Sequence, residues 1–387
     1  MNQSRTIIGV AHDPGGARAI LPVLAFLHQR GGGVSAICSG PAVEISEREF
    51  PEIPLKVMED LASHEDCVEV LASHECRALV SAAGLYNTIE HTMRLAARAQ
   101  GVPVVAVLDW WSMPRERLQR RFPDGRIVTS FPDRICALDE TSRAELMEEG
   151  FTAPQIVVTG AANLESSWKR LGRYTPQVGK LREEIGIRAG EKCAVFFSEP
   201  YIRASDGLPW KGLGGNHHQD CTPVYGYTAH GMLAETAAAL ASQKPAHQDL
   251  VLCVKPHPME DVPSLVAAMG QCESKGIRMV LVDRIDPLWL CATGDIFFGM
   301  VSIILMEAAL TRRPVLSVQI GFEGGMACDP CMSNRLGFTR PVYDRTALRQ
   351  HVAQWFEGSL PGTGKDVSLA FEGAAGRIAQ TIAKSLG

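Results

Sequence analysis

The sequence predicts an α/β protein of two Rossmann-like domains that face each other across a central cleft. Short apolar segments rich in β-branched residues alternate with helical patterns in both halves of the chain, which is typical of parallel sheets covered by helices on both faces. The length of 387 residues is also that of about two domains. Sheets of this kind bind ligands at the carboxyl ends of their strands, so the candidate site residues are expected there.

The first domain is expected over about residues 1–163. Its strand segments are residues 6–11, 34–38, 55–57, 78–81, 102–108, 134–138 and 155–159, and its helical segments are 17–29, 58–75 and 87–100. The more charged segment 164–187 follows, and its composition predicts a solvated helical connector between the domains.

The second domain is expected over about residues 188–365. Its strand segments are residues 194–198, 250–255, 279–282, 296–298 and 315–319, and its helical segments are 231–242, 262–275, 287–292, 302–311 and 346–358. A last helix is expected within 366–387. The sequence leaves open whether that helix packs back on the first domain.

The composition indicates a globular protein, because 46% of the residues are hydrophobic and 21% are charged. The 38 basic and 43 acidic residues give a formal net charge of −5 without a long run of either sign. Neither nucleic acid nor a polybasic membrane patch is therefore expected. Eleven scattered cysteines and an N-terminus without a leader pattern favour a reduced, cytoplasmic protein.

The first candidate site is the turn after the first strand, where His12 and Asp13 precede Pro14, Gly15 and Gly16. Two glycines let the backbone approach a ligand closely, and the N-terminus of the following helix favours an anionic group. A plain strand-to-helix turn, with Asp13 as the cap of the helix, explains the same residues equally well. The turn lacks the full G-x-G-x-x-G pattern, which argues against a nicotinamide or flavin enzyme.

The second candidate is the run from Lys255 to Pro258, at the end of an apolar strand. Two prolines fix the backbone on either side of His257 and end the strand, so the imidazole is expected at the carboxyl edge of the sheet. His257 would there donate a hydrogen bond to a phosphate oxygen, with Lys255 as a second positive group. A rigid turn with an exposed histidine is the alternative.

The third candidate is the loop 299–302, from Gly299 to Ser302, which is expected to open into a helix that contains Ile303 and Glu307. Free backbone N–H groups at a helix start suit a diphosphate. Glu307 lies within about one and a half helical turns of the loop, so its carboxylate would accept hydrogen bonds from ribose hydroxyls. The alternative is a capped amphipathic helix with an exposed glutamate.

Two more features have a structural and a functional interpretation. Asp109 and Trp110 end a strand segment at the edge of the cleft, where the indole either stacks on a sugar or covers the core. The long loop 198–230 is rich in glycine and aromatic residues, and such loops are often functional. The histidine pair 217–218 and the single C-x-x-C at 328–331 lack the second ligand pair of a metal site, so no metal is expected.

These motifs together resemble the GT-B superfamily of nucleotide-sugar enzymes, over most of the chain. The superfamily includes UDP-N-acetylglucosamine 2-epimerases and the cell-surface polymer transferases of the CDP-glycerol glycerophosphotransferase and capsule polysaccharide type. The resemblance is carried by residues 12–17, 132–138, 149–150 and 156–160 in the first half, and by 254–258, 299–310 and 313–316 in the second.

The resemblance implies a metal-independent glycosyltransferase, or a polyol-phosphate transferase, in bacterial surface glycan biosynthesis. A nucleotide-activated donor would be a substrate and no cofactor is expected; the acceptor would be a glycan or glycolipid, bound on the side of Asp109 and Trp110. Peripheral membrane association and a homodimer stay open. The implied donor-binding residues are Gly15, Gly16, Lys255, His257, Gly299, Ser302, Ile303 and Glu307, with Ser302 at the phosphate and Glu307 at the ribose.

An epimerase or hydrolase of the UDP-N-acetylglucosamine 2-epimerase type is the alternative, as is a non-catalytic nucleotide-sugar-binding protein. The epimerases carry an acidic residue at the end of the fourth strand, where this chain has residues 81–84, Ser-Ala-Ala-Gly. Their paired glutamates have only Asp109 and Glu116 as loose counterparts. A transferase is therefore the preferred interpretation.

Transfer to a hydroxyl group needs a base that removes its proton. In a GT-B cleft the first turn of the first domain lies on the acceptor side, which makes Asp13 and His12 the candidates. Histidine titrates near neutral pH, whereas an aspartate needs partial desolvation to raise its pKa from about 3.9. Asp13 ranks first because the Pro-Gly-Gly sequence after it fixes its direction.

Overall fold

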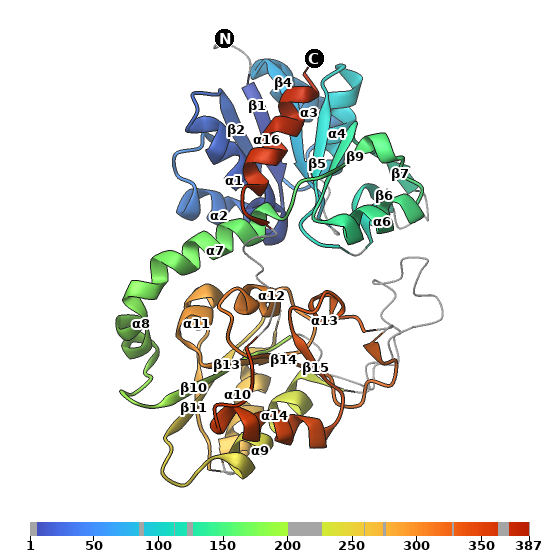
Figure 1. Cartoon of the computed structure of the whole chain (residues 1–387). Helices are drawn as coiled ribbons and strands as arrows, with labels where there is room; N and C mark the ends of the chain where they lie inside the picture. Colours follow the sequence, from blue (N-terminus) through green and yellow to red (C-terminus); the bar gives the residue numbers. More distant parts are fainter. Residues whose placement is uncertain are drawn as a thin grey trace. The chain divides into compact units, whose positions relative to one another are not determined.

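The computed structural model describes residues 6–84, 89–111, 113–121, 127–199, 227–258, 260–273, 276–326, 329–362 and 371–386. The chain divides into two compact units, one formed by Met1–Ser166 with Ala370–Gly387 and the other by Ser167–Leu369 (Figure 1). The division falls inside helix α7 (Ala162–Tyr174), which begins where the sequence predicts a helical connector. Each unit has a sheet and a hydrophobic core of its own.

The first unit is built on a parallel sheet of strand order β3-β2-β1-β4-β5-β8-β9. Its strands are β1 (Thr6–Ala11), β2 (Val34–Cys38), β3 (Leu55–Val57), β4 (Cys76–Ala82), β5 (Val104–Val107), β8 (Arg134–Ala137) and β9 (Ile156–Val158). β1 pairs with β2 on one side and with β4 on the other, so the strand order reverses there. The crevice between β1 and β4 is the switch point at which such sheets bind ligands.

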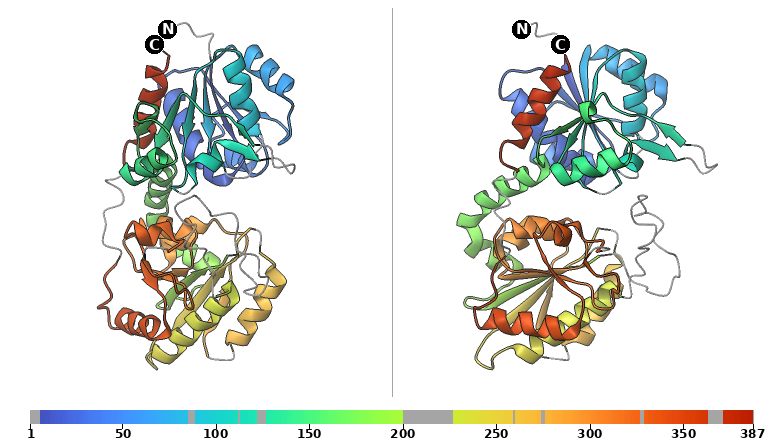
Figure 2. Two further views of the ribbon diagram at one scale, coloured as in Figure 1. Left: turned by 90° about the vertical axis from the view of Figure 1, so that its right-hand side faces the viewer. Right: turned by 45° about the vertical axis from the view of Figure 1, so that its right-hand side comes forward.

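Helices cover both faces of this sheet (Figure 2). α1 (Pro14–His28), α2 (Pro41–Glu49) and α16 (Ala374–Lys384) share one core cluster, and α3 (His64–Ser73) and α4 (Ile89–Ala99) share the other. Strand β1 serves both clusters, since Ile8 and Val10 pack on the side of α3 and α4 while Ala11 packs on the side of α1. Side chains alternate between the two faces of a strand, which is why β1 is a continuous apolar run.

The last helix, α16, belongs to the first unit. The two carboxylate oxygens of Glu165 accept hydrogen bonds from the backbone N–H groups of Gly373 (3.1 Å) and Ala375 (3.0 Å), at the start of the helix. Arg377 Nε donates to the Thr159 carbonyl oxygen at 2.7 Å. Ile378 is fully buried in the core shared with α1. These contacts anchor the end of the chain to the sheet that its beginning forms.

The second unit has a parallel sheet of strand order β12-β11-β10-β13-β14-β15. Its strands are β10 (Lys192–Phe197), β11 (Leu250–Lys255), β12 (Arg278–Leu281), β13 (Ile296–Gly299), β14 (Val315–Val318) and β15 (Arg340–Val342). Its helices are α8 (Val178–Ile185), α9 (Ala229–Gln243), α10 (Val262–Glu273), α11 (Pro287–Thr293), α12 (Ile304–Ala309), α13 (Met332–Arg335) and α14 (Arg345–Phe356). Its switch point lies between β10 and β13, which pair directly. Both halves thus form the parallel α/β sheets that the sequence predicts.

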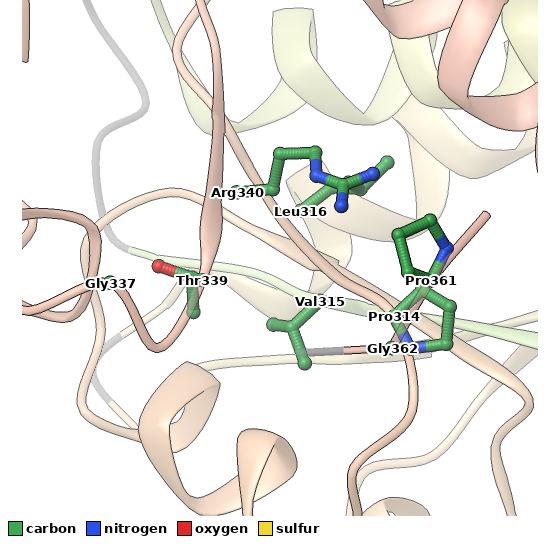
Figure 3. Close-up of a pocket in the computed structure, with 8 residues that line it drawn as sticks. All are labelled: Pro314, Val315, Leu316, Gly337, Thr339, Arg340, Pro361 and Gly362. Atoms are coloured by element: carbon green, nitrogen blue, oxygen red, sulfur yellow. The ribbon is translucent and has the colours of Figure 1, made fainter. Parts of the chain in front are cut away.

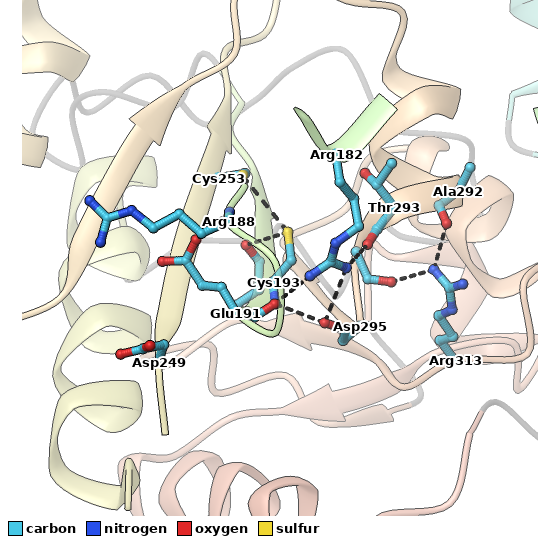
Figure 4. Close-up of polar contacts among 12 residues, drawn as sticks. Arg182, Arg188, Glu191, Cys193, Asp249, Cys253, Ala292, Thr293, Asp295 and Arg313 are labelled. Atoms are coloured by element: carbon cyan, nitrogen blue, oxygen red, sulfur yellow. Dashed lines mark hydrogen bonds and ion pairs between the residues drawn. The ribbon is translucent and has the colours of Figure 1, made fainter. Parts of the chain in front are cut away.

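A polar network joins α8 to the amino ends of β10 and β13 (Figure 4). Arg182 Nη1 donates to the Thr293 carbonyl oxygen at 2.7 Å and lies 3.5 Å from Asp295 Oδ2. The same Asp295 oxygen accepts the backbone N–H of Cys193 at 2.8 Å. Because the network uses the amino ends of the strands, it leaves the carboxyl ends free for a site.

Several elements differ from the predicted segments. The helix predicted at 58–75 is α3, which begins after Ser63 because Ser63 and Asp66 form a capping box. The helix predicted from Ser302 begins at Ile304. The sequence also did not predict the hairpin of β6 (Gln119–Arg121) and β7 (Ile127–Thr129), the helices α2, α5 (Pro114–Arg117), α6 (Glu140–Glu148) and α13, or strand β15. These elements are short, and β6 is polar throughout, so they carry little periodic signal.

None of the helices among the described residues combines the length and the apolarity needed to cross a membrane.

Because α16 packs against the core of the first unit, truncating its buried residue Ile378 is expected to destabilise the protein. Replacing Ile378 with Ala is expected to lower the free energy of unfolding by about 2–5 kcal/mol, since the side chain is buried and leaves a cavity. Lys384→Ala, at an exposed position of the same helix, is the control and should stay within about 0.5 kcal/mol of the wild type. Urea unfolding of both variants measures the difference, and equal midpoints would contradict the packing of α16 on the first unit.

Candidate functional site

The carboxyl end of β1 brings a histidine together with several carboxyl groups. The backbone N–H of His12 donates to Glu90 Oε1 at 3.1 Å. The imidazole Nδ1 of His12 lies 2.9 Å from Ser39 Oγ and 3.0 Å from Asp60 Oδ1, and its Nε2 lies 3.8 Å from Asp13 Oδ1. The two residues expected to supply the base therefore lie in one polar cluster at the switch point of the first sheet.

Asp13 stands at the N-cap position of α1, but its side chain makes no capping hydrogen bond. Burial raises the pKa of its carboxyl group above the ordinary value, and the nearby Asp109 adds to this effect, while His12 and Arg117 oppose it. A raised pKa is the change that an aspartate needs to act as a base near neutral pH. The base role of Asp13 and His12 stays a prediction that these contacts allow.

Asp109 follows β5 and packs against the start of α1. Its Oδ1 forms an ion pair with Arg117 Nη1 at 2.8 Å, and its backbone oxygen accepts a hydrogen bond from Asn163 Nδ2 at 3.2 Å. A Cβ atom on Gly15 would lie 2.2 Å from Asp109 Oδ2, and one on Gly16 would lie 2.7 Å from the Cβ atom of Ala82. The glycines thus let α1 approach the ends of β4 and β5, and their expected contact with a donor stays a prediction.

Trp110, expected on the acceptor side, is half-buried and meets the ring of Trp111 edge-on, with the ring centroids 5.6 Å apart. Trp111 itself is fully buried. Of the two tryptophans, Trp110 is therefore the one with surface left for a ligand, and its contact with an acceptor stays a prediction.

The sequence did not predict Glu90, Ser39 or Asp60 in this cluster, and Glu90 is the most deeply buried of the three. Its side chain is 0% exposed, and burial raises its pKa to about 8, with Arg94 opposing and Asp13 adding to the shift. Arg94, also buried, donates to Ser81 Oγ at 2.7 Å. A signal was present in the sequence: Glu90 and Arg94 lie one turn apart on the same face of α4 as the core residue Met93, and charged residues on an apolar face are rarely buried without a reason.

In the second unit, Lys255 and His257 lie at the carboxyl edge of β11, where the sequence places them. Lys255 Nζ donates to the backbone oxygen of Asp283, and burial lowers the pKa of the Lys255 ammonium. Burial likewise lowers the pKa of His257, which favours the neutral imidazole. The backbone N–H of His257 donates to Glu260 Oε2 at 3.1 Å, and Ser198 Oγ donates to Glu260 Oε1 at 2.6 Å.

The backbone N–H groups of the loop after β13 were predicted to be free for a ligand, but in the structure they donate hydrogen bonds within the chain. The amides of Met300, Val301 and Ser302 all donate to one oxygen, Glu199 Oε1, at 3.2, 2.7 and 2.9 Å. The N–H groups expected to be free for a diphosphate are therefore engaged by a carboxylate. Glu199 is 3% exposed, and burial raises its pKa to about 7 although these three donors oppose the shift.

Glu307 lies on α12 and accepts a hydrogen bond from Ser167 Oγ, on α7, at 2.6 Å. Gly299 permits close packing at the end of β13, because a Cβ atom there would lie 2.8 Å from Leu305 Cδ2. Ile303 is the N-cap residue of α12. The predicted donor-binding residues of this unit thus lie at the carboxyl ends of β11 and β13, on either side of β10, and Glu307 already accepts a hydrogen bond from Ser167.

Two cavities lie at the opposite, amino edges of the sheets. One of about 100 Å³ in the second unit is lined by Pro314, Val315, Leu316, Gly337, Thr339, Arg340, Pro361 and Gly362 (Figure 3). One of about 940 Å³ in the first unit includes Arg98, Arg134 and Lys384 in its lining. Neither contains a residue of the candidate site. Residues 200–226 of the long loop, with the histidine pair 217–218, and Cys328 lie outside the described residues.

Solved structures share this architecture over nearly the whole chain. The UDP-GlcNAc 2-epimerase of Neisseria meningitidis bound to UDP-GlcNAc is 14% identical, with a TM-score of 0.65 and coverage of 98% of this chain and 99% of the other. A glycosyltransferase of Rickettsia africae is 15% identical, with a TM-score of 0.57 and coverage of 100% and 96%. Anabaena HepE in complex with UDP and glucose is 18% identical, with a TM-score of 0.57 and coverage of 98% and 99%.

The chain has the GT-B fold. The resemblance drawn from the motifs is confirmed at the level of the fold. The sequence matches no protein-family model and no curated protein. At sequence identities of 12–18%, the structural neighbours show the fold of this chain but not its reaction.

Because α1 packs closely against Asp109, adding a methyl group at Gly15 is expected to destabilise the protein. Gly15→Ala is expected to lower the free energy of unfolding by about 1–3 kcal/mol, since the new Cβ atom would collide with the Asp109 carboxylate. Gly172→Ala is the matched control: it lies inside α7, nothing lies within 4 Å of its Cβ position, and alanine favours a helix. Urea unfolding should move the two variants in opposite directions. A Gly15→Ala protein as stable as the wild type would contradict the contact.

Proposed function

We propose that the protein is a metal-independent glycosyltransferase, or a polyol-phosphate transferase, which uses a nucleotide-activated donor in bacterial surface glycan biosynthesis. One observation supports this most: each sheet has its own set of chemically active side chains at its carboxyl edge. The first set, around His12 and Asp13, contains a carboxyl group whose pKa burial has raised. The second contains Lys255 and His257. A two-substrate transfer needs such a division between an acceptor that loses a proton and a donor that loses a nucleotide.

The second unit is the proposed donor side. His257, held neutral by burial, would donate a hydrogen bond to a donor phosphate, and Lys255 would add positive charge. Glu307, whose Oε1 accepts a hydrogen bond from Ser167, would accept a hydrogen bond from a ribose hydroxyl. Glu199 holds the amides of the loop after β13, so phosphate contacts would come from side chains, or from those amides once Glu199 has moved.

The first unit is the proposed acceptor side. Asp13, in its ionised form, would take the proton from the acceptor hydroxyl as that oxygen attacks the donor. The bond from the donor to its nucleotide phosphate would break, and the nucleotide would leave with the electron pair. HepE and the Rickettsia africae glycosyltransferase support a transfer, since the first structure contains UDP and glucose and the second is named for this activity.

A nucleotide-sugar 2-epimerase or hydrolase is the second candidate. It is favoured by the carboxyl groups of Glu90 and Asp109 around Asp13, because epimerisation needs an acid and a base on one sugar. The residues at the end of β4, Ala82 and Ala83, are not acidic. The two candidates differ in one measurable respect, since an epimerase or hydrolase consumes a nucleotide sugar without an acceptor.

Nucleotide binding is the first test. UDP, CDP, CMP, GDP and ADP are screened by thermal shift, and a ligand at 100 times its dissociation constant should add about 2.7 kcal/mol to the free energy of unfolding. Absence of a shift with every nucleotide would refute both candidates. A shift without turnover, with or without acceptors, would indicate a non-catalytic nucleotide-sugar-binding protein.

Two substitutions test the donor residues. His257→Ala should weaken transition-state binding by about 1.5–3 kcal/mol, the range for a hydrogen bond to a charged group. Glu307→Ala should raise the dissociation constant of ribonucleotides more than that of nucleotides lacking ribose hydroxyls. His247→Ala, an exposed histidine before β11, is the control for the first. Wild-type donor affinity in both site variants, measured by calorimetry, would remove them from the donor site.

Asp13→Asn tests the base. Because the Asp13 side chain makes no capping hydrogen bond, the variant should fold normally, and as a base its loss should lower kcat about 10²–10⁴-fold while donor affinity is kept. His12→Ala is measured beside it. A larger loss with His12→Ala would assign the proton transfer to the histidine, and nearly full activity of both variants would exclude this turn from the chemistry.

A further inference from the structure

Glu90 lies behind the His12–Asp13 turn, at the switch point of the first sheet. Its side chain is fully buried, and the backbone N–H of His12 donates to its Oε1 at 3.1 Å. Its second oxygen, Oε2, is buried as well and has no hydrogen-bond partner among the described residues. One half of this carboxyl group is therefore used to hold the turn, and the other half is left without a partner.

The charged and titratable groups around Glu90 come from every element packed against it. They are His12 after β1, Cys38 at the end of β2, Asp13 at the start of α1, Asp109 after β5 with its ion-pair partner Arg117 on α5, and His91 and Arg94 on α4. The two aspartates disfavour a charge on Glu90, and Arg94 favours it. The guanidinium of Arg94, however, donates to Ser81, Ala82, Ser130 and His91. Its hydrogen bonds thus hold the end of β4 and its surroundings, not the Glu90 carboxyl group.

These surroundings decide which carboxyl group keeps a proton. An ionised carboxylate with a partner on only one oxygen is strongly disfavoured in a buried site, and a neutral carboxylic acid is much less so. Asp13 is partly exposed and has the imidazole of His12 beside it, 3.8 Å away. When two carboxyl groups share a site, the more buried one retains the proton and the more solvated one ionises.

We propose that Glu90 and Asp13 form an unequal carboxyl pair, in which Glu90 keeps a proton, positions the turn through the His12 N–H group and leaves Asp13 as the ionised member. The pair deepens the proposed function, because it rests on Asp13 as the base. Glu90 itself touches no substrate in this scheme and is a positioning residue. Burial raises the pKa of Glu90 to about 8, which agrees with the geometry.

The proton on Glu90 has a consequence for stability that needs no substrate. A glutamate in the unfolded chain ionises near pH 4.3, whereas Glu90 in the folded protein stays protonated up to about pH 8. Between these values the folded state binds one more proton than the unfolded state, so rising pH favours unfolding by about tenfold in the equilibrium constant for each pH unit. Glu90→Gln keeps an acceptor for the His12 N–H group but cannot ionise, so it removes this loss.

The test is urea unfolding of the wild type and Glu90→Gln from pH 4 to 9. The folding equilibrium constant of the variant, relative to the wild type, should be level near pH 4, rise about tenfold per pH unit above about pH 5, and level off near pH 8. Glu165→Gln is the matched control, since this glutamate is buried in the same unit but both of its oxygens accept backbone N–H groups. A ratio for Glu90→Gln that stays flat or falls with rising pH would overturn the proposal.

The pairing with Asp13 is tested in a second pair of proteins. With Asp13→Asn in the background, the negative charge that raises the proton affinity of Glu90 is gone, so the rise should end at a lower pH than in the wild-type background. An unchanged end point would refute the pair. These measurements do not depend on turnover, so a failure to bind nucleotides would sink the proposed function and leave the result on Glu90 standing.

Turnover gives the functional readout. Ionisation of Glu90 would place a further negative charge beside Asp13 and Asp109 and disturb the turn, so the wild type should lose activity above about pH 8. In Glu90→Gln the pH at which activity falls should move upward. A merely structural role would scale kcat equally at every pH, and that result would overturn the positioning role.

Discussion

A buried glutamate lies at the switch point of each sheet, and the candidate site residues of each unit lie near the glutamate of that unit. In the first unit Glu90 accepts the backbone N–H of His12, which follows β1. In the second unit Glu199, which follows β10, accepts the N–H groups of Met300, Val301 and Ser302. The switch point is where parallel strands part and leave backbone amides without a strand partner. A glutamate side chain of the chain itself accepts hydrogen bonds from these amides.

The two glutamates differ in the number of backbone N–H groups that donate hydrogen bonds to them. Three amides converge on one oxygen of Glu199, and an anion with several N–H partners is stabilised even when it is buried. Glu90 accepts one N–H group, and among the described residues its second oxygen has no hydrogen-bond partner. The three N–H groups of the loop after β13 favour the charged form of Glu199, but burial outweighs them and raises its pKa to about 7. The surroundings of Glu90 mark the crevice beside β1 as a place where a carboxyl group holds a proton.

The sequence predicts the strands of the two sheets, because the signal for each strand lies within a short segment of the chain. β1 and β10 are continuous apolar runs, and parallel strands buried on both faces require such runs. It also predicts Lys255 and His257 at a strand end, since prolines next to His257 end the strand. Glu199 was not predictable in the same way. Its three partners lie 101 to 103 residues further along the chain, and only the pairing of β10 with β13 brings them together.

The structural neighbours likewise indicate the arrangement of the strands but not the side-chain contacts that decide the chemistry. At 14% identity and a TM-score of 0.65, the Neisseria meningitidis epimerase shares the fold of this chain, and a shared fold supports many reactions. In this chain β4 ends in Ala82 and not in an acidic residue, while Glu90 brings a carboxyl group to the same crevice from helix α4. Glu90, which lies on α4, is fully buried, whereas Asp13, which follows β1, is partly exposed. The proposed reaction therefore depends on the protonation of Glu90 and Asp13 in this chain.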